Sequence, residues 1–203
     1  MSCPTPGTRL LLVRHGQSTW NADGRWQGQA DPPLSPLGEH QAADAAVRVE
    51  PVEALWTSDL VRARRTADIV AQRIAVPVRV DRRLRERDAG PWQGHTRAEI
   101  DERWPGYLET GRRPAGFEPD EALLDRVLSA IEAIADAHSG QRILVVTHGG
   151  IVRTLERHLG DATRGFLPNL GGRFIDANAG GGWVLGDEVL LVGDEAVTRP
   201  GQI

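Results

Sequence analysis

Two short apolar runs of this chain each end in a histidine followed by glycine. Residues 10–13 lead into Arg14 and His15, and residues 143–147 lead into His148. A short apolar run bounded by a turn signal is typical of a buried strand in a parallel sheet. Because ligands of open α/β sheets bind beyond the carboxyl ends of such strands, we expect the two histidines to converge on one site.

Helical and strand patterns alternate along the rest of the chain. Ser35 followed by proline predicts a helix N-cap, and Thr96 with Glu99 three positions later predicts a capping box. Apolar residues at helical spacing predict helices over about 35–49, 60–74, 119–138 and 151–159. Short apolar runs predict strands over 53–57, 76–80, 183–185 and 189–192.

Strands that alternate with helices predict an α/β fold, here a three-layer α/β/α sandwich with a mostly parallel central sheet. The length of 203 residues fits a single domain over 1–203. A glycine- and proline-rich stretch at about 105–120 is expected to form a short lid-like segment near the mouth of the crevice.

Composition excludes several classes of function. A net charge of −4 argues against a nucleic-acid or anionic-membrane surface, and the apolar runs are too short to span a bilayer. One cysteine, Cys3, excludes an internal disulfide and a cysteine-based zinc site. With no apparent signal peptide, we expect a cytoplasmic protein. All 24 basic residues are arginines, which excludes a lysine nucleophile or a P-loop lysine.

Four motifs follow one another in a specific order. They are Arg14-His15-Gly16, then Ser58-Asp59-Leu60-Val61-Arg62-Ala63 with Thr66-Ala67, then Leu84-Arg85-Glu86 with Gly90, Trp92 and Gly94, and last Thr147-His148-Gly149-Gly150. Together, over about residues 10–159, these motifs resemble the histidine phosphatase superfamily, also called phosphoglycerate mutase-like. The resemblance implies an enzyme that acts on a small phosphorylated substrate.

The residue types in these motifs suit phosphoryl transfer. Arginine forks match phosphate oxygens and stay charged, so Arg14 and Arg62 are expected to bind the phosphate. The resemblance implies that His15 carries the phosphoryl group while His148 steadies the transferring oxygens. It also implies that Glu86 is the general acid and then the general base.

Further residues are candidates for the substrate site. Asn21, Gln27 and Gly28 match positions that contact phosphate or substrate in relatives, although turn-forming or loop roles would also explain them. Gly149 is expected to line the same pocket. Arg85 and Arg87 flank Glu86. Either their side chains point inward beside the Glu86 carboxyl group, or the alternation of side chains along an extended segment turns them away from it. The remaining histidines, His40, His95, His138 and His158, are expected to be structural or superficial.

No residues here have metal-ligand spacing, and relatives work without metal, so we expect neither metal nor cofactor. Phosphoglycerate mutases of this family share the same core residues but carry a longer insertion between the positions of Glu86 and His148. The short segment here favours a phosphatase, with the mutase as the alternative.

The substrate remains open at this stage. A sugar or glycerate phosphate such as glucosyl-3-phosphoglycerate, broad acid phosphatase activity, and phosphohistidine on proteins are the alternatives. A non-catalytic phosphoprotein-binding domain would be expected to lose His15 or Glu86, and both are present. The short C-terminal strands could pair across a homodimer.

Overall fold

A mixed six-stranded sheet forms the centre of the computed structural model, which describes residues 7–161, 165, 167–178 and 182–198. The strands run in the spatial order β3-β2-β4-β1-β5-β6. Their bounds are β1 (Arg9–Arg14), β2 (Ala54–Thr57), β3 (Val78–Val80), β4 (Arg142–Thr147), β5 (Gly171–Ala177) and β6 (Trp183–Leu190). The pairs β3–β2, β2–β4 and β4–β1 are parallel, whereas β1–β5 and β5–β6 are antiparallel.

The register of the two central strands positions the candidate site. In the parallel pair of β1 and β4, Arg14 lies opposite Thr147. His15 and His148 therefore leave neighbouring strands at the same level and at the same end of the sheet. This is the crevice position predicted for them.

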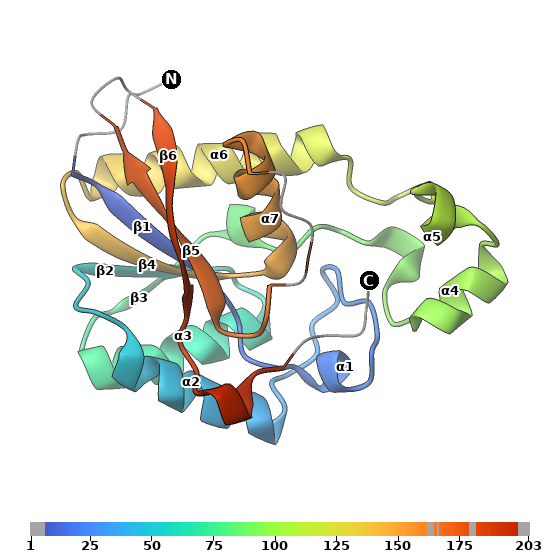
Figure 1. Cartoon of the computed structure of the whole chain (residues 1–203), viewed down its shortest axis with the longest axis horizontal. Coiled ribbons are helices and arrows are strands. Elements are labelled where there is room, and N and C mark those ends of the chain that lie inside the picture. The colour runs from blue at the N-terminus through green and yellow to red at the C-terminus, as the bar shows by residue number, and fades with distance from the viewer. Residues whose placement is uncertain (1–6, 162–164, 166, 179–181, 199–203) are drawn as a thin grey trace.

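Two pairs of helices cover the sheet, one pair on each face (Figure 1). α2 (Pro36–Arg48) and α3 (Val61–Ile74) lie on one face, and α6 (Asp120–Ala137) and α7 (Gly149–His158) lie on the other. Side chains alternate between the faces along β1: Leu10 and Leu12 belong to the core cluster under α6 and α7, whereas Leu11 and Val13 belong to the cluster under α2 and α3. The predicted three-layer α/β/α architecture is confirmed.

Short helices project beyond the carboxyl ends of the parallel strands. They are α1 (Thr19–Ala22), α4 (Arg97–Arg103) and α5 (Tyr107–Thr110), with single 3₁₀ turns at Arg82–Leu84, Gly90–Trp92 and Asp194–Ala196. α4 and α5 extend to the right of the sheet in Figure 1. A third apolar cluster, built around the fully buried Trp92 and Ile100, joins them to the body of the protein. None of the described helices has the length and apolar content that crossing a membrane requires.

The local signals read from the sequence are confirmed at several element boundaries. The Ser35 hydroxyl accepts a hydrogen bond from the Gly38 N–H and caps α2, and Thr96 with Glu99 forms the predicted capping box of α4. The predictions for the C-terminal region are wrong in two respects. β5 was not predicted, and the two short strands expected over 183–185 and 189–192 are one continuous strand, β6.

The reason for the second error is the position of β6 in the sheet. Its middle residues, Gly186-Asp187-Glu188, read as a turn between two strands. However, β6 pairs with β5 on one side only and is mostly exposed or half-buried. An edge strand accommodates polar residues that a central parallel strand would exclude.

Candidate active site

His15 and His148 lie side by side at the predicted strand ends. Their ring centroids are 5.2 Å apart, and the ring planes are inclined by 66°. Both imidazoles are buried, since His15 is 2% exposed and His148 is not exposed at all. The convergence inferred from two strand-end histidines is therefore found in the structure.

The hydrogen bonds of His15 determine its tautomer. Nδ1 lies 2.6 Å from the carbonyl oxygen of Gly16. A carbonyl oxygen can only accept, so Nδ1 carries the ring hydrogen and Nε2 keeps its lone pair. Nε2 in turn accepts a hydrogen bond of 3.1 Å from Nε of Arg62. The basic nitrogen of His15 is thus directed toward a cation.

Burial keeps both imidazoles in the neutral form. The pKa of His15 is held well below 6.5, first by burial and then by the positive charges of Arg62 and Arg14. The pKa of His148 is lowered in the same direction, again first by burial and then by Arg62 and other neighbours. A neutral imidazole with a free nitrogen is the form that can attack phosphorus.

These lowered pKa values predict how the free protein responds to pH. In a proton NMR titration between pH 8 and pH 6, the ring signals of His15 and His148 should show no midpoint near the ordinary histidine pKa of about 6.5. Unfolded histidines take up protons near that pH while these folded ones do not. Their contribution to the free energy of unfolding is therefore fully present above pH 6.5 and declines as the pH falls below it. Signals that vanish in His15→Ala or His148→Ala identify the two rings, and a midpoint near 6.5 for either would contradict this assignment.

Arg62 reaches the site from the first turn of α3 and is completely buried. Its NH1 and NH2 groups donate to the carbonyl oxygens of Ala30 and Gly28, both at 2.8 Å. Burial lowers the pKa of Arg62 to about 10, partly opposed by the negative charge of Glu86. The guanidinium is therefore still charged at neutral pH and is held rigidly beside Nε2 of His15.

Arg14 and His148 each present a buried polar atom that has no hydrogen-bond partner among the described residues. These atoms are Nε of Arg14 and Nδ1 of His148. NH1 of Arg14 donates to the Leu167 carbonyl at 2.7 Å, and Nε2 of His148 lies 2.7 Å from the Ser58 hydroxyl. Burial lowers the pKa of Arg14 to about 10. Buried polar atoms are nearly always paired, so these two atoms are available to bind a polar ligand.

The carboxylate of Glu86 lies against the first turn of α7. Its Oε2 accepts from the Gly150 N–H at 3.1 Å, and its Oε1 accepts from the Arg87 N–H at 2.8 Å. The flanking arginine side chains turn away, as alternation allowed: Arg85 pairs with Asp59 and Arg87 with Asp120, both at 2.6 Å. Among the described residues no arginine forms an ion pair with the Glu86 carboxylate, and its charge acts on the buried guanidinium groups of Arg14 and Arg62.

The other candidate residues form one wall of the site. Gln27 Oε1 accepts from the Ser18 hydroxyl at 2.6 Å, and Asn21 Oδ1 accepts from the Ser18 N–H at 3.2 Å, which caps α1. Gly28 takes part through the carbonyl that binds Arg62. A side chain at Gly149 would contact Arg14, so Gly149 lies directly beside that guanidinium. The structure brings all of these residues to the same end of the sheet.

Two buried residues of the site were not singled out from the sequence. Ser58 bonds His148, and it follows β2 directly, so the strand-end argument applied to the two histidines could also have found it. Asn169 is fully buried and donates to the His15 carbonyl at 2.9 Å. It lies in the irregular C-terminal region, where no periodic signal marks it.

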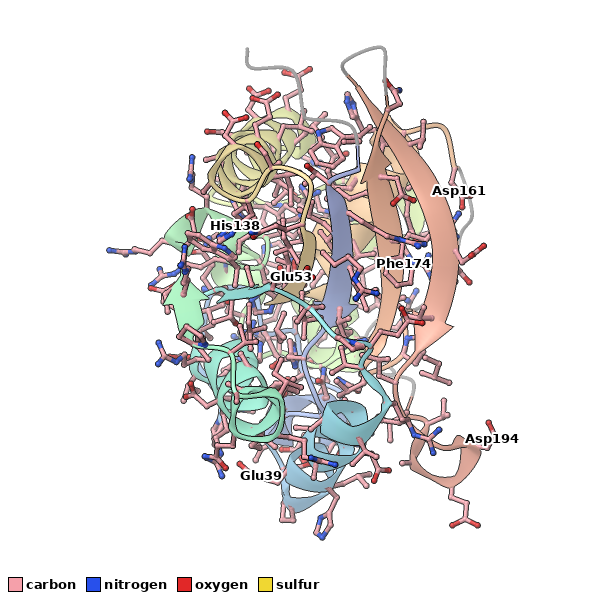
Figure 2. The ribbon with its side chains drawn as sticks, turned by 90° about the vertical axis from the view of Figure 1, so that its left-hand side faces the viewer. Glu39, Glu53, His138, Asp161, Phe174 and Asp194 are labelled. Atoms are coloured by element: carbon pink, nitrogen blue, oxygen red, sulfur yellow. The ribbon has the colours of Figure 1, made fainter. Side chains whose placement is uncertain are left out.

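The remaining histidines lie elsewhere. His40 is exposed on α2 and bonds the Pro36 carbonyl, and His138 ends α6, where it bonds Gln141 and Arg79. Figure 2 shows His138 and Glu39 on opposite faces of the sheet. His95 bonds Arg103 at the surface of the α4 region.

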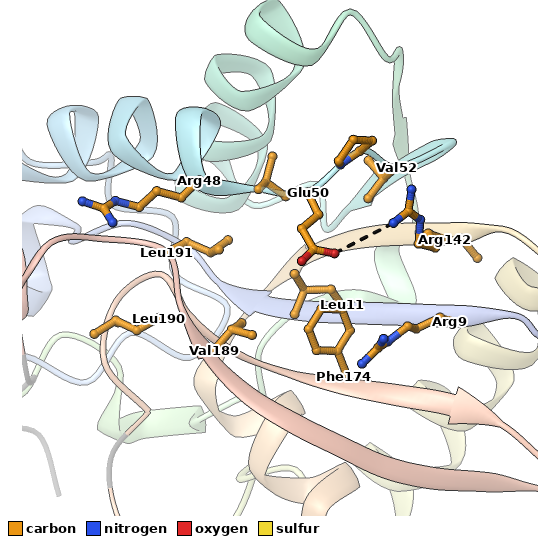
Figure 3. Close-up of a pocket in the computed structure, with 13 residues that line it drawn as sticks. Arg9, Leu11, Arg48, Glu50, Val52, Arg142, Phe174, Val189, Leu190 and Leu191 are labelled. Carbon is orange, nitrogen blue, oxygen red and sulfur yellow. Dashed lines mark ion pairs between the residues drawn. The ribbon is translucent and has the colours of Figure 1, made fainter.

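A groove of about 310 Å³ lies away from this site, between the end of α2 and strands β5 and β6 (Figure 3). Arginines line it, but carboxylates accompany them: Arg142 pairs with Glu50 at 3.8 Å, and Arg9 pairs with Asp176 at 3.2 Å. The groove contains neither strand-end histidine and is separate from the candidate active site.

The chain is similar to known phosphatases and to a probable phosphoglycerate mutase. The chain is 38% identical to the metal-independent phosphoserine phosphatase of Arabidopsis thaliana over 73% of this chain and 67% of that protein. It is 40% identical to the probable phosphoglycerate mutase GpmB of Escherichia coli over 70% of this chain and 69% of that protein. Among solved structures, a mycobacterial glucosyl-3-phosphoglycerate phosphatase superposes with a TM-score of 0.79 at 31% identity, covering 88% of this chain and 97% of that one.

A model of the histidine phosphatase superfamily, branch 1, matches residues 10–177. This range includes all four motifs and both strand-end histidines. The chain therefore belongs to the histidine phosphatase superfamily, and it is a phosphomonoester hydrolase.

Proposed function

We propose that Nε2 of His15 is the nucleophile of a two-step phosphomonoester hydrolysis. In the first step, Nε2 forms a bond to phosphorus while the bond from phosphorus to the alcohol oxygen breaks. In the second step, water attacks the phosphohistidine, the N–P bond breaks and inorganic phosphate leaves. The observation that carries this proposal is the lone pair on Nε2, fixed by the Nδ1–H bond to the Gly16 carbonyl.

Arg14, Arg62 and His148 bind the transferring phosphoryl group in this proposal. Arg62 donates from Nε to the nucleophilic nitrogen, and this donor passes to a phosphoryl oxygen when the lone pair of Nε2 attacks phosphorus. The unpaired Nε of Arg14 and Nδ1 of His148 supply further donors. Donors held in place before the reaction stabilise the charge that develops in the transition state. Asn21, Gln27, Gly28 and Gly149 complete the wall around the substrate.

Glu86 supplies and recovers the proton. It protonates the alcohol oxygen as that oxygen leaves, and it then takes a proton from the attacking water, which restores the starting form. The support for this role is its position, since Oε2 lies on the N–H of Gly150, two residues after His148. Glu86 lies in a loop, whereas the two histidines directly follow the central strands β1 and β4.

A methyl group at Gly150 should separate Glu86 from the site. A Cβ at this position would collide with Oε1 of Glu86 and lie 3.1 Å from its Cδ. Since alanine favours helices over glycine by up to about 1 kcal/mol, Gly150→Ala should fold normally but displace the flexible carboxylate. We expect kcat/KM for an alkyl phosphate to fall at least about tenfold, a part of the usual contribution of a general acid.

Gly149→Ala provides the comparison. Its Cβ would meet Cδ of Arg14 at 3.5 Å, which is an ordinary contact, so the loss should be smaller than for Gly150→Ala. Steady-state kinetics together with thermal unfolding of both variants separate the two effects. A Gly150→Ala variant with full activity on alkyl phosphates would argue that Glu86 acts from another position.

The proposed substrate is a sugar or glycerate phosphate. The support is the similarity to a mycobacterial glucosyl-3-phosphoglycerate phosphatase, which extends over 88% of this chain. The lid-like segment carries a cation, Arg113, which lies over the rings of Trp92 and Phe117, 5.1 and 5.2 Å from their centroids. A carboxylate or hydroxyl group on the substrate is the kind of partner that such an arginine can bind.

No metal or cofactor is part of the proposed mechanism. Among the residues that the structure describes, no group of three or more histidine, cysteine or carboxylate side chains is arranged to hold a metal ion. The two site histidines serve the phosphoryl group instead. Hydrolysis in the presence of EDTA should therefore proceed at the full rate.

The test of the function is phosphate release in EDTA from a panel of phosphomonoesters. The panel contains glucosyl-3-phosphoglycerate, 3-phosphoglycerate, phosphoserine, other sugar phosphates, nucleotides and an aryl phosphate. We expect one glycerate or sugar phosphate to have the highest kcat/KM and 3-phosphoglycerate to give negligible 2-phosphoglycerate. Efficient formation of 2-phosphoglycerate would favour the mutase, a flat profile would favour a broad acid phosphatase, and no turnover would favour a phosphoprotein substrate or a binding domain.

We further propose that the protein acts in the cytoplasm as a homodimer without nucleic-acid partners. The support for a dimer is the exposed edge of β6, where Val184 and Leu190 are 45% and 39% exposed. The single cysteine supports the cytoplasmic location, because disulfide-rich chains are typical of oxidising compartments. The net charge of −4 supports the absence of nucleic-acid partners. Light scattering after size exclusion tests the dimer, and cell fractionation tests the location.

A further inference from the structure

The guanidinium group of Arg126 on α6 bonds the loop that carries Glu86, the 3₁₀ turn before that loop and the carboxylate of Glu118. NH1 donates to the carbonyl oxygens of Arg83 and Arg85, both at 2.7 Å, and NH2 donates to the carbonyl oxygen of Glu86 at 3.0 Å. The remaining two donors bind the carboxylate of Glu118, with Nε on Oε1 at 2.6 Å and NH2 on Oε2 at 2.8 Å. A guanidinium has five N–H donors, and here each has an acceptor.

The Glu86 loop is held largely by side-chain contacts. Residues 85–89 belong to no helix or strand, so no ladder of backbone hydrogen bonds satisfies their carbonyl groups. Besides Arg126, the side-chain amide of Gln29 donates to the Glu86 carbonyl at 3.2 Å. Arg126 bonds two carbonyls of this loop, those of Arg85 and Glu86, together with the Arg83 carbonyl in the 3₁₀ turn before it, and its side chain is only 20% exposed.

Glu118 extends this contact to the end of the lid-like segment. Its Oε2 accepts from the Asp88 N–H at 3.0 Å, and its own N–H donates to the Asp88 carbonyl at 2.9 Å. Its carbonyl oxygen accepts from NH1 of Arg87 at 2.7 Å. The Arg126–Glu118 pair therefore joins α6, the lid-like segment and the Glu86 loop.

We propose that Arg126, with Glu118 as its counter-charge, is a positioning residue that holds Glu86 where its carboxyl can protonate the leaving alcohol. The inference rests on the proposed role of Glu86 as the general acid. Arg126 does not touch the substrate, and it acts on the reaction through the main chain of Glu86. Proton transfer depends strongly on distance, and a displacement of about 1 Å can cost on the order of a hundredfold in rate.

The test compares substrates that differ in their need for a proton. A nitrophenolate leaves without protonation, whereas the alkoxide of a phosphoglycerate or sugar phosphate does not. A displaced Glu86 should therefore lower kcat/KM for the alkyl phosphate more than for 4-nitrophenyl phosphate. Because kcat/KM includes steps only up to loss of the leaving group, the later attack of water does not affect this comparison.

The principal variant is Arg126→Lys, which keeps the charge but has three donors in place of five. Glu118→Gln is the second, milder variant. Arg83→Lys is the matched control, since Arg83 binds Asp81 and the Ser129 hydroxyl on α6 with a similar fork but makes no side-chain bond to the Glu86 loop. The ratio of the two kcat/KM values is measured on one sample, so any unfolded fraction cancels.

Glu86→Gln is the reference variant, because it removes the proposed acid itself. We expect it to raise the ratio of kcat/KM for the aryl phosphate to kcat/KM for the alkyl phosphate by on the order of a hundredfold. We expect Arg126→Lys to change the ratio about tenfold in the same direction, Glu118→Gln to change it less, and Arg83→Lys to leave it unaltered. An unaltered ratio in Arg126→Lys, or an equal change in Arg83→Lys, would overturn the inference while leaving the proposed function intact. An unaltered ratio in Glu86→Gln would instead overturn the proposed role of Glu86 itself.

Discussion

Replacing His15 by alanine should reduce phosphate release from every substrate by on the order of ten-thousandfold or more, as expected when a covalent nucleophile is removed. The lone pair of Nε2 is held ready by the Gly16 carbonyl and the Arg62 guanidinium. The pKa of His15, lowered by burial, keeps this lone pair unprotonated at neutral pH. In the proposed mechanism His148 has a different role: its Nε2 lies 2.7 Å from the Ser58 hydroxyl, and its unpaired Nδ1 donates to the phosphoryl group.

The decisive measurement is the covalent intermediate. Brief incubation of the wild-type protein with a labelled phosphomonoester, followed by denaturation, should leave label that is stable in alkali and lost in acid, as a phosphoramidate is. His40→Ala is the control, because that histidine is exposed on α2 and bonds only its own helix. Label retained by His15→Ala would place the phosphoryl group on another residue and refute the proposed mechanism.

Replacing Arg62 by methionine should lower kcat/KM by on the order of a thousandfold, at the upper end of the cost of removing one preorganised donor to a transition state. The side chain is fully buried and donates to the nucleophile and to the carbonyls of Gly28 and Ala30. Its removal therefore takes away both a charge beside the phosphoryl group and the hydrogen bonds that shape the loop around the substrate. The two orphaned carbonyls should also destabilise the fold by about 1–3 kcal/mol each.

Arg64→Met is the matched control on the same helix. Arg64 is 44% exposed and pairs with Asp68 one turn along α3, a kind of surface pair that contributes about 1 kcal/mol or less. Its loss should leave kcat/KM unaltered. Calorimetric titration with inorganic phosphate provides an independent readout, in which Arg62→Met should bind phosphate much more weakly than Arg64→Met. Equal phosphate binding by both variants would mean that Arg62 is a purely structural residue.

The strand-end argument predicted the centre of the site. Residues 10–13 and 143–147 are apolar enough to be buried on both faces, and parallel strands of one sheet end at the same edge. Their register, with Arg14 opposite Thr147, brings His15 and His148 together. The motif around Arg62 likewise places it in the first turn of a helix that begins at that edge.

The supporting contacts could not be predicted in the same way. Asn169 bonds the His15 carbonyl from a glycine-rich region without periodicity, and Arg126 looks like an ordinary polar residue of an amphipathic helix. Each is defined by partners far away in the chain. The side-chain orientations of Arg85 and Arg87 likewise depend on their ion-pair partners, Asp59 and Asp120, which are distant in the sequence.

The sequence by itself determined the α/β class and the helices of both outer layers, because periodicity and capping are local properties, and its motifs named the candidate residues of the phosphoryl site through their resemblance to a family. Only the tertiary structure decided that β6 is one strand, that Nε2 of His15 carries the lone pair, and that Arg126 holds the Glu86 loop. The physical reason is that hydrogen-bond satisfaction and burial are properties of groups brought together by folding. A side chain's partners, and with them its tautomer and charge state, exist only once the distant segments are packed.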